Sequence, residues 1–225
     1  MADREFIYNR ETNRYRYKDS GRFAPKSAII NLTKKNIKNT EKELETITGL
    51  LFDGNMRLDD WQRTSAKTIK TLHLEHLLLG KGGVNNTNDS DYLAIGRDLR
   101  KEYGYLRQFA QDIKDGKVSR KQALTRVKMY GNKSRHAYWV GNDRANNKGW
   151  MKRNLGLTDI HCEDCLRYFS LGWQPRGTLP MPTEACQCRA NCKCSVIYSK
   201  ELPTEDSITD ALTRFSKGFG FIGSS

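Results

Sequence analysis

Apolar side chains recur with helical spacing in the first third of the chain. After Ser27, a possible N-cap, they come at intervals of seven, three and four, at Ile30, Ile37, Leu44, Ile47 and Leu51. This spacing places them on one face of a long helix, which Asp-Gly-Asn at 53–55 ends. A second helix, with Asp59 as the predicted cap, carries Trp61, Ile69, Leu72 and Leu79 on its apolar side. Two such helices joined by a short loop predict an antiparallel hairpin.

Two further helices are predicted downstream. From about Ser90, helical spacing holds for Tyr92, Ile95, Leu99, Leu106, Phe109 and Ile113, and Asp115-Gly116 ends the pattern. Ser119 then caps a fourth helix, which continues through Tyr130 and on to Tyr138. The connector at 79–91 contains Gly-Lys-Gly-Gly, but it lacks the strand before it and the Gly-Lys-Ser/Thr ending of a phosphate-binding loop.

The two ends differ from this helical middle. Residues 4–25 mix aromatic and polar side chains, which predicts a short hairpin or extended arm, or a basic tail ordered only on a partner. The final stretch predicts one short helix at 205–216 and then a loose tail. Its three phenylalanines are expected to dock on the body or on a partner.

The expected fold is mainly α. It has an elongated helical body, made of a helical hairpin plus two further helices, and a small zinc-stabilised α+β C-terminal lobe. The predicted boundaries are 1–26 for the N-terminal arm or hairpin, 27–150 for the body, 151–200 for the Cys-rich lobe and 201–225 for the tail.

All six cysteines lie within one window near the C-terminus: Cys162, Cys165, Cys186, Cys188, Cys192 and Cys194. A Cys-x-x-Cys turn can aim two sulfurs at one point, and a second pair beyond a loop can complete the tetrahedron that Zn²⁺ prefers. Cys-x-Cys in an extended strand also places two sulfurs on one face. Four of the six thiols could hold a single zinc ion, or all six could hold two ions with bridging thiolates.

A structural metal is the preferred interpretation of this window, ahead of a redox or disulfide role and of catalysis. The chain has no apolar run of the roughly 20 residues that span a bilayer and no signal-peptide core, so a reducing compartment is expected. A short segment rich in Gly and Pro needs the metal to fold. Catalytic zinc usually keeps an open position. The window offers only His161 as a histidine and Glu163, Asp164 and Glu184 as bases.

Charge adds a possible partner. The formal net charge is +13, from 39 Lys and Arg against 26 Asp and Glu, which favours a polyanionic neighbour, although many basic proteins bind no nucleic acid. The fourth helix carries the basic residues Arg120, Lys121, Arg126, Lys128, Lys133 and Arg135. They are candidate contacts to nucleic acid or an acidic partner, with a solvated face as the alternative. His73 and His76 could share a metal, but an ordinary structural role is favoured.

Residues 161–198 resemble the C-terminal region of phage minor head proteins, the Mu F-like head morphogenesis family. The matching residues are His161, Cys162, Cys165, Gly172, Trp173, Pro175, Gly177, Leu179, Pro180, Asn191, Cys192 and Cys194. A weaker similarity extends to "RYRYKDSGRF" at 14–23 and to "HLLLGKGG" at 76–83. With this resemblance taken into account, the preferred zinc ligands are Cys162, Cys165, Cys188 and Cys194. Cys186 and Cys192 are substitutes or ligands of a second ion.

The resemblance implies a non-enzymatic structural virion protein of a tailed bacteriophage. It would be assembled in the host cytoplasm and located in the head, with portal or capsid subunits and packaged DNA as partners and no membrane association. The alternative is a zinc-ribbon nucleic-acid-binding protein outside any particle. A weaker third hypothesis is a metal-dependent nuclease that uses His161.

Overall fold

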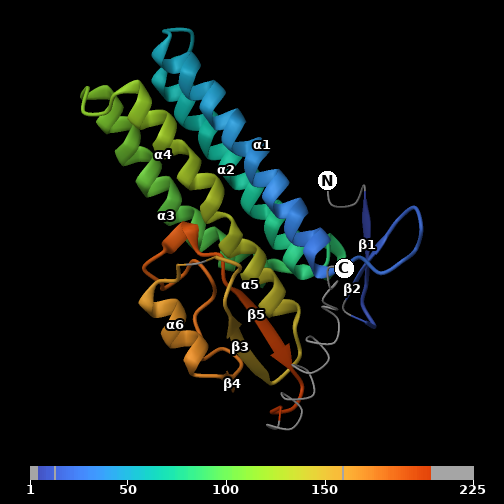
Figure 1. The fold of residues 1–225 in the computed structure, drawn as a ribbon. Coiled ribbons are helices and arrows are strands. Elements are labelled where there is room, and N and C mark those ends of the chain that lie inside the picture. Colours follow the sequence, from blue (N-terminus) through green and yellow to red (C-terminus); the bar gives the residue numbers. More distant parts are fainter. Residues whose placement is uncertain (1–4, 13, 159, 204–225) are drawn as a thin grey trace, which may run out of the picture.

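The computed structural model describes residues 5–12, 14–158 and 160–203. It is mainly helical, with a small strand-containing C-terminal region, as predicted (Figure 1). The predicted helix at 205–216 and the phenylalanine-rich tail lie outside the described residues.

The body is built from α1 (Lys26–Phe52), α2 (Leu58–Lys81), α3 (Asp89–Lys114), α4 (Arg120–Lys133) and α5 (Arg135–Ala145). The first four run side by side as an elongated bundle, and α5 continues from α4 toward the C-terminal lobe (Figure 1). A short 3-10 helix, η2 (Val84–Asn86), lies in the connector between α2 and α3. Among the described helices, none is long and apolar enough to cross a membrane.

The helix starts show which sequence signals were correct. Ser119 caps α4, and its hydroxyl and the side chain of Gln122 bond reciprocally as a capping box. The predictions for Ser27 and Asp59 were wrong. Both lie in the first turn, after Pro25 and Arg57, which occupy the cap positions without side-chain bonds. Asp59 still favours the helix, because a carboxylate complements the positive end of the helix dipole.

The fourth helix does not continue to Tyr138 as predicted. It ends at Lys133, and Ser134 is both the C-cap residue of α4 and the N-cap residue of α5. The Ser134 hydroxyl donates to the Gly131 carbonyl at 2.7 Å and lies 3.0 Å from Nδ1 of His76 on α2. A serine side chain that bonds the preceding turn competes with regular helix geometry. The break therefore depends on a tertiary contact as well as on local sequence.

Trp61 lies at the centre of the first hydrophobic core, inside the bundle. Its side chain is fully buried, and its indole N–H donates to the Thr48 hydroxyl at 2.9 Å. Phe109 of α3 packs edge-to-face against it, with ring centroids 5.4 Å apart. Most of the apolar positions predicted from periodicity on α1, α2 and α3 are buried, whereas Tyr92 at the start of α3 is exposed.

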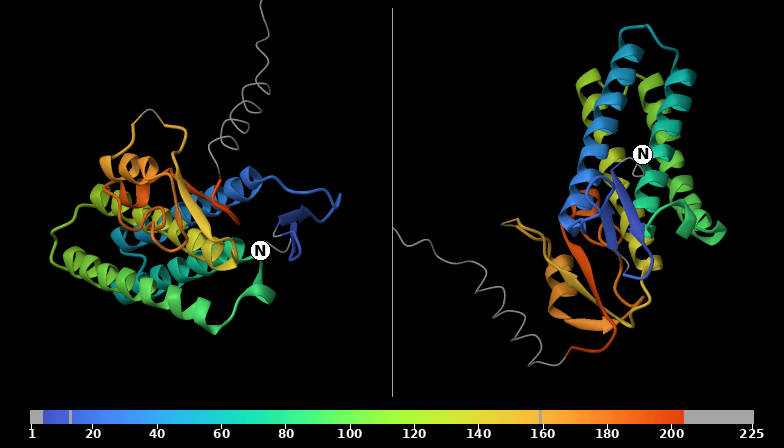
Figure 2. Two further views of the ribbon diagram at one scale, coloured as in Figure 1. Left: turned by 90° about the horizontal axis from the view of Figure 1, so that it is seen from below. Right: turned by 90° about the vertical axis from the view of Figure 1, so that its right-hand side faces the viewer.

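The C-terminal lobe contains a small antiparallel sheet. Its strands are β3 (Trp150–Asn154), β4 (Trp173–Pro175) and β5 (Ser195–Ser199), in the order β4-β3-β5. The short helix α6 (Glu163–Ser170) contacts β3, and the 3-10 helix η3 (Arg189–Asn191) contacts α4. The lobe lies beside α5 at one end of the bundle (Figures 1 and 2).

An N-terminal hairpin is also present, which confirms that prediction for residues 5–25. It pairs β1 (Phe6–Asn9) with β2 (Arg14–Tyr17), with Phe6 opposite Tyr17. The Tyr15 hydroxyl donates to the Leu79 carbonyl of α2 at 2.7 Å, so the hairpin is attached to the bundle.

A second hydrophobic core joins all three parts of the protein. Its buried members are Phe6, Ala24, Ile29, Leu79, Tyr138, Trp139, Met151, Leu179, Met181 and Val196. They come from the hairpin and the residues that follow it, from α1, α2 and α5, from the sheet and from the loop after β4. The predicted boundaries at 26 and 150 therefore separate elements that share one core.

Helices α2 and α5 approach each other closely at two glycines. A Cβ atom added to Gly80 would lie 2.1 Å from the Tyr138 carbonyl oxygen, and one added to Gly141 would lie 2.4 Å from the Leu77 carbonyl oxygen. Both obstacles are backbone atoms, which a rotamer change cannot move. The sequence requires glycine here because any larger residue would separate the helices.

We expect Gly80→Ala to destabilise the protein by about 1–3 kcal/mol, the usual cost of overpacking. Gly96→Ala on α3 is the matched control, because its Cβ would meet nothing within 4 Å. Replacing this helical glycine should stabilise by up to about 1 kcal/mol. Urea unfolding followed by circular dichroism measures both changes. Equal effects of the two substitutions would contradict a close α2–α5 crossing.

Candidate metal centre

The six cysteines come from four local structures of the lobe. Cys162 is the N-cap residue of α6, and Cys165 lies in its first turn. Cys186 and Cys188 precede η3, Cys192 follows it, and Cys194 directly precedes β5. All six belong to one cluster, although 20 residues separate Cys165 from Cys186 in the sequence.

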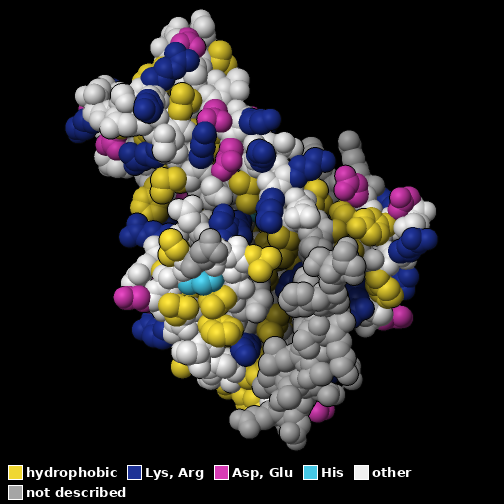
Figure 3. Space-filling model, in the orientation of Figure 1, with side chains coloured by type: hydrophobic (Ala, Val, Ile, Leu, Met, Phe, Trp, Pro, Cys, Tyr) yellow, Lys and Arg dark blue, Asp and Glu magenta, His cyan; other side chains and the backbone are white. Residues whose placement is uncertain are grey.

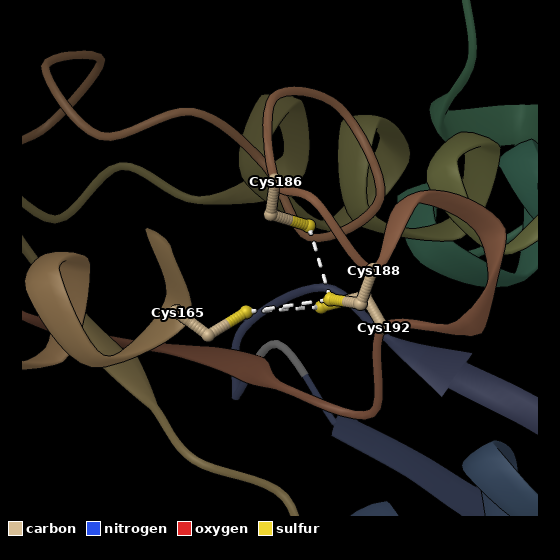
Figure 4. Close-up of side chains that lie close together, drawn as sticks. All are labelled: Cys165, Cys186, Cys188 and Cys192. Atoms are coloured by element: carbon tan, nitrogen blue, oxygen red, sulfur yellow. Dashed lines mark hydrogen bonds between the residues drawn. The ribbon is translucent and has the colours of Figure 1, made fainter. Parts of the chain in front are cut away.

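Four of these sulfurs have the spacing of a metal-ligand shell. The sulfurs of Cys165, Cys186, Cys188 and Cys192 all lie within 4.8 Å of one another and point toward a common centre (Figure 4). Three pairs within this set are Cys186–Cys188 at 3.4 Å, Cys165–Cys188 at 3.6 Å and Cys165–Cys192 at 3.7 Å. Zn–S bonds of about 2.3 Å in a tetrahedron require neighbouring sulfurs about 3.8 Å apart. These four cysteines could therefore bind a metal ion.

The sulfurs of the other two cysteines, Cys162 and Cys194, contact members of this four-sulfur set. Cys162 Sγ lies 3.5 Å from Cys188 Sγ, and the Cys194 thiol is hydrogen-bonded with Cys192 and Cys165. The preferred set predicted above thus differs from the closest four. It contains Cys165 and Cys188, but the structure places Cys186 and Cys192 in the shell where Cys162 and Cys194 were expected. Which four cysteines lie closest together depends on the positions of the loop residues in the fold, and the spacing of cysteines in the sequence does not specify those positions.

The thiols compete for negative charge. Hydrogen bonds from the Cys194 thiol and from backbone N–H groups lower the pKa of Cys192 to about 4. Burial raises the pKa of Cys165 to about 12, and it also raises the pKa values of Cys186 and Cys188. Among these four thiols, Cys192 is therefore the one that loses its proton most readily. A divalent metal would displace the remaining protons, so metal affinity should rise with pH.

Arg135, at the start of α5, is a cation of the bundle that interacts with the cysteines. Burial lowers its pKa, whereas interaction with Cys192 and Cys194 opposes that shift. Nearby, Lys133 Nζ donates to the Thr183 carbonyl of the lobe at 3.1 Å. Two of the six predicted nucleic-acid contacts are thus directed toward the lobe.

Three of the other basic residues form ion pairs within the bundle. Arg120 pairs with Asp53, Arg126 pairs with Asp112 at 2.9 Å, and Lys128 pairs with Glu45 at 2.7 Å. Lys121 is exposed. On the face shown in Figure 3, Lys and Arg side chains are spread over the bundle among Asp and Glu. Nucleic-acid binding by residues 120–135 stays a prediction.

Two of the four candidate catalytic groups of the window, Asp164 and Glu184, have structural partners. Asp164 pairs with Arg167 at 2.9 Å and accepts from the Gln187 N–H at 3.0 Å. Glu184 accepts from the Met181 N–H at 2.8 Å. His73 and His76 are buried inside the bundle, and the metal-ligand cluster found among the described residues contains neither of them.

Arg135→Met should weaken zinc binding about 10–100-fold, the usual effect of removing a group that supports metal ligands. Methionine keeps most of the side-chain length but leaves the thiolates without this cation. Lys121→Met, on the exposed side of α4, is the matched control and should leave the affinity unchanged. Competition with a chromogenic chelator measures both. Equal affinities in the two variants would show that Arg135 does not stabilise the thiolates.

Sequence reasoning grouped the cysteines but named Arg135 only as a candidate nucleic-acid contact, because nothing in the sequence shows that it lies near Cys192 and Cys194. Comparisons of the chain with protein-family models, with curated proteins and with solved structures gave no match.

Proposed function

We propose that the cysteine cluster is a structural zinc site that fixes the C-terminal lobe to the helical bundle. The observation that carries this proposal is the four-sulfur set: its sulfurs all lie within 4.8 Å of one another, and four thiolates around one ion would fill a tetrahedral shell and leave no position for water or substrate. Three of its sulfurs belong to side chains that are almost completely buried. The cluster also lies beside α4 and α5, where a clamp would hold the shared core together.

Zinc is the metal that this donor set favours. Thiolates are soft ligands, which select zinc, copper(I) or iron–sulfur clusters over magnesium, calcium and manganese. A tetrahedral set of sulfurs without an open position is the usual structural zinc arrangement.

We further propose that the protein is a structural component of a tailed phage head. The resemblance of residues 161–198 to minor head proteins supports this proposal, as does an elongated helical bundle that offers long side surfaces to neighbouring subunits. Portal or capsid subunits are the proposed partners, with packaged DNA as a further neighbour of a chain of charge +13. The proposal assigns no reaction to the protein.

The second candidate function is a zinc-containing nucleic-acid-binding protein outside any particle. The same net charge favours it. The ion pairs of Arg120, Arg126 and Lys128 weigh against it, because these side chains already have carboxylate partners.

Quantitative mass spectrometry of purified phage particles, with zinc measured on the same sample, tests the proposal. We expect this chain at a fixed ratio to the portal subunit. Its absence from intact particles, together with salt-sensitive DNA binding by the purified protein, would favour the second candidate instead.

A further inference from the structure

Two sulfurs remain once the four-sulfur set is assigned, and neither is isolated. Cys162 interacts with Cys165 and Cys188, and Cys194 interacts with Cys165 and Cys192. Each leftover thiol therefore contacts two members of the first set. We propose that the cluster holds two zinc ions, with Cys162 and Cys194 as the ligands specific to the second. This inference rests on the proposed function, namely that the cluster binds zinc.

The number of neighbours around each sulfur supports two ions. In a single tetrahedron, each sulfur has three others at the ligand-to-ligand distance. When two tetrahedra share an edge, each shared sulfur has five. All five other sulfurs surround Cys165: Cys188 lies at 3.6 Å, Cys192 at 3.7 Å and Cys186 within 4.8 Å, and Cys162 and Cys194 are hydrogen-bond partners of its thiol, which is more neighbours than the three of a single tetrahedron. Cys165 therefore occupies the position of a bridging ligand.

The second ligand shared by the two ions is either Cys188 or Cys192. Cys188 and Cys192 each contact four other sulfurs, including Cys165. Cys188 is the one that reaches Cys162, and Cys192 is the one that reaches Cys194. Two four-coordinate ions need eight ligand positions, and six thiolates supply them when two are shared. The first ion then has two terminal ligands, Cys186 and whichever of Cys188 and Cys192 is not shared, and the second ion has Cys162 and Cys194.

Positively charged side chains lie near the proposed ligands of the second ion, where they would balance the negative charge of the cluster. Two divalent ions with six thiolates carry a net charge of −2, which a partly buried site must balance. Arg135 faces Cys192 and Cys194, the latter a ligand specific to the second ion. Arg135 and Lys193 also line the same surface cleft as Cys194.

Native mass spectrometry of the full chain, reconstituted with zinc under reducing conditions, counts the ions directly. We expect two zinc ions per wild-type chain. Cys162→Ser and Cys194→Ser should each retain one ion, because the first set is complete without either residue. Cys186→Ser should also retain one, since it removes a terminal ligand of the first ion only. Ser195→Ala, next to Cys194 but outside the cluster, is the control and should retain two.

The outcomes separate this inference from the proposed function. One zinc ion in the wild type and also in the Cys162→Ser and Cys194→Ser variants would overturn the second ion and leave the structural zinc site standing. Two ions in the wild type that survive both substitutions would overturn the ligand assignment. A wild-type chain that binds no zinc would overturn both proposals.

Discussion

Removing the metal should unfold the C-terminal lobe but leave the part of the helical bundle around Trp61 folded. Structural zinc supplies about 10–16 kcal/mol to small domains, and residues 150–200 have too little core of their own to replace it. Because Trp139 and Leu79 share a core with Met151 and Val196 of the sheet, the adjoining ends of α5 and α2 should loosen as well. The core around Trp61 should remain protected.

Hydrogen–deuterium exchange, with and without a strong zinc chelator, measures this response for each segment. Cys165→Ser should reproduce the effect of the chelator, because Cys165 belongs to the four-sulfur set and is the ligand that the two proposed ions share. Ser170→Ala at the end of α6 is the matched control. Unchanged protection of β3 and β5 after metal removal would show that the lobe does not need the ion.

Acid should destabilise the bundle through its buried histidines. Burial lowers the pKa of His73 to about 3 and that of His76 to about 4. In the unfolded chain the pKa of histidine is about 6.5, so the unfolded state binds more protons as the pH falls below 6.5. Stability is therefore full above about pH 7 and declines on acidification. At pH 5 each histidine should cost about 2 kcal/mol, or about 4 kcal/mol together.

The surroundings of His73 make it the better residue for the test. No hydrogen-bond partner is found for either ring nitrogen of His73, whereas Nδ1 of His76 lies 3.0 Å from the Ser134 hydroxyl. The charged and titratable groups that act on His73 are His76 on its own helix, Asp98 on α3, Lys133 on α4 and His136 on α5. Only Asp98 raises its pKa, and His136 already pairs with that carboxylate at 3.3 Å.

His73→Leu should leave stability at pH 8 unchanged or higher and should remove about half of the loss at pH 5. Urea titrations at the two pH values, followed by helical circular dichroism, give the difference. Thr71→Leu, an exposed position on the same helix, controls for added hydrophobicity. If His73→Leu and the wild type lost equal stability on acidification, His73 would not be the group that titrates.

The sequence predicts the helices well because their periodicity is a local property. The apolar spacing from Ile30 to Leu51 needs no knowledge of a partner, and Ser119 with Gln122 marks a helix start within four residues. The break at Ser134 was missed because it involves His76, 58 residues away. The close approach at Gly80 and Gly141 likewise exists only once α2 and α5 are packed.

The candidate metal-binding cysteine cluster was predicted in part for a similar reason. Six cysteines in one short window indicate a metal, whatever the fold. The choice among them depends on how the loop around η3 places Cys186 and Cys192, which spacing alone leaves open. The sequence also could not predict that Phe6 and Leu179 are buried in the same hydrophobic core, because they lie far apart in the chain and neither belongs to a periodic pattern.

X-ray absorption at the zinc edge of the purified full chain tests the central claim, a closed site made only of thiolates. The account predicts four sulfur ligands per zinc at about 2.3 Å and no oxygen or nitrogen ligand. A spectrum with one or more oxygen or nitrogen ligands would instead indicate an open site, and with it a different role for the C-terminal lobe.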